Sequence, residues 1–419
     1  MSKISISFFA EILIRDLDGA TRTMFEIIDR IDRDRFEFIF FCGVPPEEDI
    51  GFEVFHVPTL TIPFNKTYKM ASMMGMGPSI VSRLDEFEPD LIHIATPAPL
   101  GYFGLKYALK KELPISSIYH THFMSYIKYY TNNTPIITSA FEAAVVQHNR
   151  SFYNRCTKIF VPTIAVKEEL EEKGFNAELM NIWPRGVKTN LFNPSKKDEN
   201  YIRNLVSNDK KNIIFASRLV WEKNLEVLID LQNIITKKEL IFTLIIAGDG
   251  MAKEELENRI PDAFFLGHVH HKELAKLYAS ADYFIFTSVT ETYGNVVTEA
   301  MASGVPCIIA DGGGSASLIK QGINGYLCKP NEAKDYLHKI QLLEGHPEFR
   351  ERMVAQAIAG MQDCTWDKII GRFFDEVEFL AQNGKIRRPQ NKNQNQPFSI
   401  SLDLSLFGER ALYSLVSVA

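Results

Sequence analysis

Short apolar runs alternate with amphipathic segments along most of this 419-residue chain. The amphipathic segments, such as 224–235 and 272–278, repeat their apolar residues at the helical spacing. This alternation is typical of βαβ units, in which a helix connects two parallel strands. The sequence therefore predicts an α/β fold, with strands at 4–9, 36–41, 53–57, 91–94, 115–119, 158–161, 212–216, 242–247, 263–266, 283–287 and 306–310.

The strand pattern divides into two halves of similar size. The polar, proline-bearing segment NPSKKD at 193–198 lies between them, just before a new strand. We predict two Rossmann-like, doubly wound domains that face a cleft, one over 1–193 and one over 194–365. The cleft between two such domains is a usual place for a ligand.

The C-terminal end has a different composition. The polar tract RRPQNKNQNQP covers 387–397, and after it apolar and polar residues alternate at the spacing of a strand. We interpret 384–419 as a polar linker and a tail without chemistry of its own, whose role is unknown.

Composition limits the class of protein. The net charge of −6 provides no positive field, so we expect no nucleic-acid partner. The five cysteines are scattered without a CxxC pair, as in a reduced, cytoplasmic protein. Glu11, Arg15 and Asp16 interrupt the apolar N-terminal segment, which we interpret as a first strand and not as a signal peptide. No apolar run is long enough to cross a bilayer, so any membrane contact is predicted to be peripheral.

The turn after the first strand, RDLDGATR at 15–22, contains one glycine, Gly19. A dinucleotide site requires GxGxxG at this place, so the sequence argues against an NAD enzyme. A sharp loop that enters a helix near Gly19 still suits a phosphate, which would meet backbone N–H groups there. A plain βα turn is the alternative.

A second loop, ASRLVWEKN at 216–224, follows the first strand of the second half. Arg218 supplies a planar fork and Lys223 a mobile point charge, and together they suit a diphosphate. Such a pair can stabilise a diphosphate leaving group without a metal. The alternative is a solvated ion pair with Glu222.

A third group of residues surrounds the segment ETYGNVVTEAMASG at 291–304. Glu291 and Glu299 can accept hydrogen bonds from hydroxyl groups, and the helix start between them offers free N–H groups to a phosphate. Two strand ends, AGDG at 247–250 and FLGHV at 265–269, bring Gly248 and Val269 beside such a ligand.

Histidines and paired aspartates offer weaker signals. His120 and His122 in YHTHF at 119–123 share one face of an extended segment. No cysteine or carboxylate lies at ligand spacing from them, so we predict no metal site. The segments DLD at 16–18 and DRD at 32–34 do not aim both carboxylates at a cleft, and we reject them as metal–diphosphate motifs.

These motifs occur in the order and spacing of glycosyltransferase family 4, the large retaining group with the GT-B fold, which the sequence resembles over about 3–380. The first half is similar to the α-mannosyltransferase and sulfoquinovosyltransferase-like branch. The matching segments are DGATRT at 18–23, HIATPAPLG at 93–101, YHTHF at 119–123 with Tyr126, and PRGVKTNLFNP at 184–194.

The resemblance implies roles for residues and for domains. The catalytic residues would be His120 near the anomeric centre, Arg218 and Lys223 on the diphosphate, and Glu291 on the transferred sugar. The donor-binding residues would be Gly19, Gly248, Val269, Gly294, Asn295, Val296 and Glu299. His122 and Tyr126 would lie on the acceptor side, with the domain over 1–193, and a helix at 366–383 would cross back to that domain.

The implied activity is that of a hexosyltransferase of EC class 2.4. A hexosyl group would move from a nucleoside-diphosphate sugar, GDP-mannose or a UDP-sugar, to an acceptor hydroxyl on a sugar, a glycan or a lipid. The mechanism would be a metal-independent, front-face reaction with retention, and no cofactor would be required. Asp18 stands where many members have a second glycine, and His122 where the branch often has an acidic residue, which leaves the donor and acceptor open.

Two segments are candidates for the acceptor side, 62–76 with its methionines, lysines and aromatics, and 126–130. They suit a lipid or membrane edge, so a cytoplasmic enzyme in peripheral contact with the inner face of the membrane is one interpretation. Ordinary packing is the other. Competing functions are a non-catalytic nucleotide-sugar-binding subunit and another GT-B enzyme, such as a sugar-nucleotide epimerase or a phosphorylase.

Overall fold

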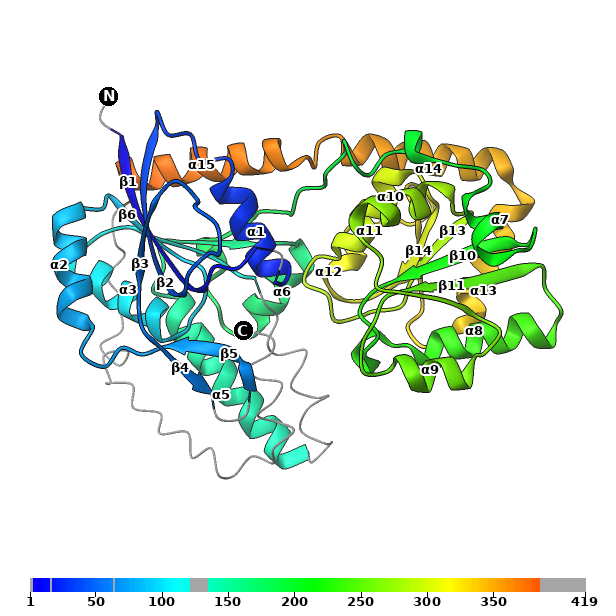
Figure 1. Ribbon diagram of the computed structural model, residues 1–419, viewed down its shortest axis with the longest axis horizontal. Helices are drawn as coiled ribbons and strands as arrows, with labels where there is room; N and C mark the ends of the chain where they lie inside the picture. The colour runs from blue at the N-terminus through cyan, green and yellow to red at the C-terminus, as the bar shows by residue number, and fades with distance from the viewer. Residues whose placement is uncertain (1–2, 16, 63–64, 121–134, 385–419) are drawn as a thin grey trace. The chain divides into compact units, whose positions relative to one another are not determined.

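The computed structural model describes residues 3–15, 17–62, 65–120 and 135–384 (Figure 1). The chain forms two compact units. The first unit consists of the described parts of Met1–Pro162, Val166–Trp183 and Ile370–Ala419, and the second consists of Thr163–Ala165 and Pro184–Ile369. His122, Tyr126 and the tail from 385 lie outside the described residues.

A seven-stranded parallel sheet forms the centre of the first unit, in the order β3-β2-β1-β6-β7-β8-β9. Its strands are β1 (Ile4–Ile12), β2 (Phe36–Val44), β3 (Glu53–His56), β6 (Leu91–Ile94), β7 (Ile115–Ile118), β8 (Lys158–Val161) and β9 (Met180–Ile182). An antiparallel pair, β4 (Thr59–Ile62) and β5 (Asn65–Ala71), forms a separate two-stranded sheet. The first half also contains helices α1 (Gly19–Ile28), α2 (Gly77–Phe87), α3 (Pro99–Lys111), α5 (Pro135–Tyr153) and α6 (Ile164–Glu172), and the 3₁₀ turn η1 (Ala177–Leu179).

A six-stranded parallel sheet forms the second unit, in the order β12-β11-β10-β13-β14-β15. Its strands are β10 (Lys211–Ala216), β11 (Phe242–Ala247), β12 (Phe264–Gly267), β13 (Tyr283–Phe286), β14 (Cys307–Ala310) and β15 (Tyr326–Cys328). Its helices are α7 (Tyr201–Val206), α8 (Glu226–Lys237), α9 (Lys253–Arg259), α10 (His271–Ser280), α11 (Asn295–Ser303), α12 (Gly313–Ala316), α13 (Ala333–Gly345) and α14 (Pro347–Met361), with 3₁₀ turns η2 (Pro194–Lys196) and η3 (Trp221–Lys223).

The inner strands are buried and mostly apolar, as is usual for a parallel sheet that helices cover on both faces. Strand β1, ISISFFAEI, is buried at all but one position, and Phe8 lies opposite Phe40 of β2 with ring centroids 5.2 Å apart. Every strand predicted from the sequence is present, and the predicted fold class, two doubly wound α/β domains, is confirmed.

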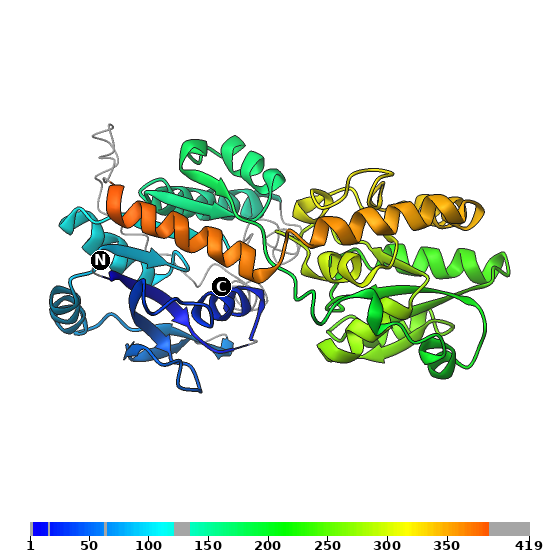
Figure 2. The same ribbon diagram turned by 90° about the horizontal axis from the view of Figure 1, so that it is seen from above.

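The last described helix, α15 (Trp366–Asn383), lies across one face of the first sheet (Figure 2). Its aromatic side chains pack on that sheet. The ring of Phe373 lies 5.0 Å from that of Phe160 and 5.5 Å from that of His93, and Phe374 lies 5.1 Å from Phe36. Lys158 pairs with Glu376 at 3.0 Å. The part of α15 from Ile370 onward therefore packs on the core of the first unit.

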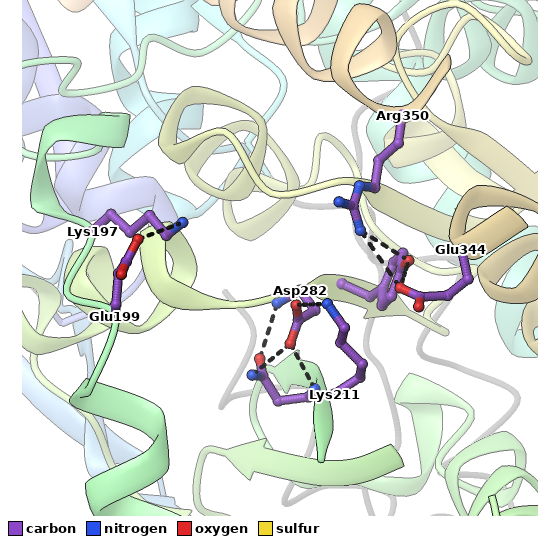
Figure 3. Close-up of polar contacts among 8 residues, drawn as sticks. Lys197, Glu199, Lys211, Asp282, Glu344 and Arg350 are labelled. Carbon is purple, nitrogen blue, oxygen red and sulfur yellow. Dashed lines mark hydrogen bonds and ion pairs between the residues drawn. The ribbon is translucent and has the colours of Figure 1, made fainter. Parts of the chain in front are cut away.

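Polar side chains join the amino ends of β10 and β13 in the second unit (Figure 3). Asp282 accepts hydrogen bonds from Asn212 N at 2.9 Å, Asn212 Nδ2 at 2.8 Å and Lys211 Nζ at 3.2 Å. In return, Asp282 N donates to Asn212 Oδ1 at 3.0 Å. Beside them, Arg350 lies 3.5 Å from Glu344, which also accepts from the hydroxyl of Tyr283. These contacts fix the start of two central strands.

Both sheets reverse their strand order at one point, between β1 and β6 and between β10 and β13. In doubly wound sheets the two loops that leave the carboxyl ends of such strands diverge, and the crevice between them receives the ligand. In the second unit these loops are 217–225 and 287–294. Arg218, Lys223 and Glu291 all lie on them.

Candidate functional site

The loop that carries Arg218 rests on the turn after β11. Ser217 N donates to Ala247 O at 3.1 Å, Leu219 N donates to Asp249 O at 2.8 Å, and Ala252 N donates to Leu219 O at 2.9 Å. A Cβ on Gly248 would lie 1.8 Å from Ser217 O, so the backbone packing itself requires glycine there. Gly248, predicted to bind the donor, thus also supports the Arg218 loop.

The turn η3 brings Glu222 and Lys223 against the loop after β13. The hydroxyl of Thr287 donates to Lys223 O at 2.7 Å, and that of Thr290 donates to Glu222 O at 3.4 Å. Both threonines are buried. Threonine hydroxyls of one loop therefore hold the backbone carbonyls of the other, which fixes where the side chains of η3 begin.

The backbone of Glu291 is held from the other side by the glycines after β14. Gly314 N donates to Glu291 O at 2.6 Å, and a Cβ on Gly314 would lie 1.9 Å from Thr292 O. The buried phenol of Tyr293 donates to Arg185 O at 2.9 Å. The Glu291 loop is therefore anchored at both of its ends before any ligand binds.

Four charged side chains meet at this point: Arg218, Glu222, Lys223 and Glu291. Lys223 Nζ lies 2.7 Å from Glu291 Oε1 and 3.8 Å from Glu222 Oε1, and Arg218 Nη2 lies 3.5 Å from Glu222 Oε1. The side chains of Lys223 and Glu222 are 3% and 4% exposed, that of Glu291 is 22% exposed and that of Arg218 is 62% exposed. We call these four residues the charge cluster.

The two cations of the charge cluster keep the carboxylate of Glu291 ionised. Burial by itself would raise the pKa of Glu291, but the Lys223 ammonium, through its charge and its hydrogen bond, and the more distant Arg218 outweigh burial and hold the pKa below its ordinary value. Glu291 is therefore a hydrogen-bond acceptor at neutral pH and not a proton donor.

The ion pair between Arg218 and Glu222 that the sequence offered as an alternative is present at 3.5 Å. It is solvated on the arginine side only, because Glu222 is buried. The sequence did not single out Glu222, Thr287 or Thr290 as parts of the site. Only the position of Glu222 next to Lys223 offered a signal.

Helix α11 begins beside Glu291 and carries the remaining predicted donor-binding residues of this segment. Gly294 caps it with φ at 95°, and the first intrahelical bonds come from Val297 and Thr298, so Asn295 N and Val296 N precede the helical ladder. Asn295 Oδ1 is enclosed and accepts no hydrogen bond within the described part of the chain. This end of α11 thus presents N–H donors and one amide oxygen.

Glu299 lies one turn further along α11 and is half-buried. The pKa of the buried Tyr278 phenol is raised, first by burial and then by the nearby Glu299 carboxylate. Val269 follows β12 and packs on the core of the second unit. The second unit therefore holds Arg218, Lys223, Gly248, Val269, Glu291, Gly294, Asn295, Val296 and Glu299.

Gly19 and His120 belong to the first unit. Gly19 opens α1, where Asp18 accepts from Thr21 N at 2.8 Å and donates its own N–H to Thr21 Oγ1 at 3.0 Å. A Cβ on Gly19 would meet nothing within 4 Å, so packing does not require a glycine at this position. His120 follows β7 and is buried.

Glu11 is a further buried carboxylate in the first unit, near the carboxyl end of β1. It accepts hydrogen bonds from Ala71 N at 2.8 Å and Leu100 N at 2.9 Å. Burial raises its pKa, against the effect of these two bonds. In the sequence, Glu11 served only as evidence against a signal peptide. Its position on a strand predicted to be buried was the signal that its carboxylate would need hydrogen-bond donors from the protein.

Two family models match the chain. Residues 17–191 match "Glycosyltransferase Family 4", and residues 196–359 match "Glycosyl transferases group 1". Over 332 residues the chain is 30% identical to a GDP-mannose-dependent alpha-mannosyltransferase of Mycolicibacterium smegmatis, which covers 77% of this chain and 84% of that protein. The chain belongs to glycosyltransferase family 4.

Two further relatives define the branch and the fold of this family 4 enzyme. Sulfoquinovosyl transferase SQD2 of Arabidopsis thaliana is 31% identical over 315 residues, covering 73% of this chain and 59% of that protein. The crystal structure of HepE from Anabaena in complex with UDP-glucose superposes with a TM-score of 0.67 at 21% identity, covering 90% of this chain and 99% of that one. The predicted family, its mannosyltransferase-like branch and its GT-B fold are confirmed.

The family 4 protein is a glycosyltransferase, as the sequence predicted. The roles assigned to single residues and the absence of a metal stay predictions. Within the described residues, no helix is both long and apolar enough to cross a membrane.

Proposed function

We propose that this glycosyltransferase moves a hexosyl group from a nucleoside-diphosphate sugar to an acceptor hydroxyl with retention of anomeric configuration. The observation that carries the proposal is the charge cluster at the point where the second sheet reverses its strand order. There the buried Lys223 pairs with Glu291, which lies on the loop that leads into α11, and the exposed Arg218 lies beside Glu222. Two cations and a helix N-terminus suit a diphosphate.

In the proposed reaction the bond between the anomeric carbon and the diphosphate breaks first. Arg218 and Lys223 stabilise the charge that develops on the leaving diphosphate. The acceptor hydroxyl then attacks from the same face, and its proton passes to the departing phosphate. Lys223 holds Glu291 as an anion, which favours a role in accepting hydrogen bonds from the sugar hydroxyls over a role as a general acid.

The remaining roles follow the family resemblance. Glu299 accepts hydrogen bonds from the ribose, and Asn295 and Val296 donate through their N–H groups to sugar and phosphate. Gly248 and Val269 border the nucleotide. In the first unit, Gly19 lets its loop approach the phosphates, and His120 lies near the anomeric carbon. No metal enters the proposed reaction, so activity should persist when EDTA is added.

GDP-mannose is the first donor to test, because the relative at 30% identity is GDP-mannose-dependent. A UDP-hexose is the second, because the solved HepE structure holds UDP-glucose. A thermal-shift screen against GDP-, UDP- and ADP-sugars separates them, since a ligand that binds the folded state raises the apparent melting temperature. The acceptor is proposed to be a hydroxyl of a glycan or a lipid, and vesicle co-sedimentation with anionic lipids tests the accompanying membrane contact.

The activity test measures nucleoside diphosphate released with and without a candidate acceptor, and the anomeric configuration of the product by NMR. Retention and acceptor-dependent release are expected. Replacing Arg218 by Ala should slow transfer by about 10²–10³-fold, the usual cost of removing one stabiliser of developing charge. Unchanged transfer by a folded Arg218→Ala enzyme, or an inverted product, would refute the proposal. Release independent of any acceptor would point to a different reaction.

A further inference from the structure

Glu222 is the one member of the charge cluster to which neither the proposed reaction nor the family resemblance gives a task. Its side chain is 4% exposed, and its carboxylate lies 3.5 Å from Arg218 Nη2 and 3.8 Å from Lys223 Nζ. Burying a carboxylate is costly unless cations compensate it. Here the two compensating cations are those proposed to hold the donor diphosphate.

The charges of the cluster balance when no ligand is bound. Arg218 and Lys223 contribute two positive charges, and Glu222 and Glu291 contribute two negative ones, so 2 − 2 gives a net charge of zero. Without Glu222 the cluster would carry one positive charge. A cluster with a net positive charge would bind any diphosphate more tightly, including the nucleoside diphosphate that must leave after each transfer.

Geometry restricts what Glu222 can do. Its backbone lies in η3 and accepts a hydrogen bond from Thr290, and its buried carboxylate lies within 4 Å of both cations. Lys223 has a second, shorter contact with Glu291 at 2.7 Å and is not held by Glu222 alone. Arg218 is 62% exposed and pairs with Glu222 at 3.5 Å. Glu222 therefore acts mainly on the charge of the site and on the position of Arg218.

We propose that Glu222 is a positioning residue whose negative charge tunes the grip of Arg218 and Lys223 on the diphosphate. It aims Arg218 and weakens the attraction for the product, so that the nucleoside diphosphate is released. This inference rests on the proposed function of the two cations. It assigns Glu222 a specific effect: the more negative the phosphate group of the ligand, the more Glu222 weakens its binding.

Isothermal titration of three ligands against the full-length protein tests this. The ligands are the nucleoside, the nucleoside monophosphate and the nucleoside diphosphate of the base that the thermal-shift screen selects. Glu222→Gln preserves the size of the side chain and removes its charge. We expect about tenfold tighter binding of the diphosphate, a smaller gain for the monophosphate and no change for the nucleoside. In turnover assays, inhibition by the diphosphate product should strengthen by the same factor.

The matched control is Glu226→Gln. Glu226 lies four residues further along the chain, pairs with Arg259 at 2.7 Å on the surface, and its replacement removes the same formal charge from the same unit. Its diphosphate affinity should stay within twofold of the wild type. Equal strengthening in both variants would show a general charge effect and overturn the inference, as would unchanged or weaker diphosphate binding by Glu222→Gln.

Two further variants keep the outcomes separable. Arg218→Ala should lose diphosphate affinity; if it binds as the wild type does, the proposed function fails and this inference with it. If Arg218→Ala binds weakly and Glu222→Gln binds no more tightly than wild type, only the inference fails. Should Glu222→Gln not fold, Glu222→Asp withdraws the carboxylate by one methylene. About threefold tighter diphosphate binding is then expected, and unchanged binding overturns the inference.

Discussion

Charged side chains lie at both ends of the neighbouring strands β10 and β13, but their contacts and exposure differ between the two ends. At the amino end, Asp282 receives three hydrogen bonds from Lys211 and Asn212 and returns one through its own N–H (Figure 3). At the carboxyl end, Lys223 lies between two carboxylates, while Arg218 is largely exposed with one carboxylate at 3.5 Å. The first group is a closed set of hydrogen bonds between two strands, whereas the second group includes a cation, Arg218, that is 62% exposed.

The topology explains why the open cluster lies at the carboxyl end. At the amino end the chain enters two neighbouring strands side by side, and short side chains bridge them. The strand order reverses between β10 and β13, so the loops that leave their carboxyl ends run to opposite sides. Each of these loops can present a charged group to the same ligand. Polar residues near strand ends therefore acquire a structural or a ligand-binding role according to the end at which they lie.

The largest effect is expected from Lys223→Ala at the carboxyl end. It removes the cation that two carboxylates share and should lower kcat/KM by about 10²–10³-fold. Because it leaves Glu222 and Glu291 close together without their shared partner, it should also reduce the free energy of unfolding by about 3–5 kcal/mol. Steady-state kinetics and urea unfolding measure the two effects. A variant with normal turnover would place the catalytic charge elsewhere.

Asp282→Ala makes the same kind of deletion at the amino end and should have a smaller effect, on stability alone. Hydrogen bonds to a charged group contribute about 1.5–3 kcal/mol, so we expect a loss of about 2 kcal/mol in the free energy of unfolding. With the carboxyl end intact, kcat/KM should stay within twofold of the wild type at a temperature where the variant is folded. A loss of turnover comparable to that of Lys223→Ala would show that the two ends are not independent.

The sequence predicted this fold well where strands were long enough to show their character. Strand β1, with nine residues, and strand β11, with six, are mostly apolar, and both were predicted. The edge strands β9 and β15 have three residues each, too few to display a period, and they were missed. The pair β4 and β5 was missed because the segment was interpreted from its methionines and lysines, not from its pairing.

The candidate site was predictable to a different degree. Arg218, Lys223 and Glu291 were identified from motif spacing, and the structure brings them together. Their contacts were not predictable, because the pairing of Lys223 with Glu291 depends on two loops that are 68 residues apart in the chain. Glu222 was treated as the partner of a solvated pair because nothing in a local sequence distinguishes a buried carboxylate from an exposed one.

A smaller and pH-dependent effect is expected from Glu291→Gln. A carboxyl whose pKa is lower in the folded than in the unfolded protein stabilises the fold above its unfolded pKa, and this contribution is lost as the pH falls through the folded pKa. The pKa of Glu291 is lowered from an ordinary value of 4.5. At pH 7 the wild type should therefore melt about 2–4 °C above Glu291→Gln. For a unit of this size, such a shift corresponds to a difference of about 1 kcal/mol in the free energy of unfolding.

The difference in melting temperature between the wild type and Glu291→Gln should narrow below about pH 4.5. It should vanish in stronger acid, because both proteins then carry a neutral side chain at 291. Melting temperatures of the two proteins from pH 7 to pH 3 measure it, and all other carboxyls cancel in the comparison. A difference that stays constant across this range would mean that Glu291 stabilises the fold by packing and not by its charge.

The smallest effect is expected from Glu199→Gln, which sharpens what distinguishes the carboxyl end. Lys197 is exposed to about the same extent as Arg218, 57% against 62%, and it also has a carboxylate nearby, Glu199 at 3.8 Å (Figure 3). The difference is in the carboxylates, since Glu199 is 85% exposed and Glu222 is 4% exposed. Water screens the first pair, so its loss should change the free energy of unfolding by less than about 0.5 kcal/mol and leave diphosphate binding unchanged. If Glu199→Gln changed diphosphate affinity as much as Glu222→Gln does, the burial of the carboxylate at 222 would not matter. Any carboxylate near an exposed cation of this unit would then have the same effect on diphosphate binding.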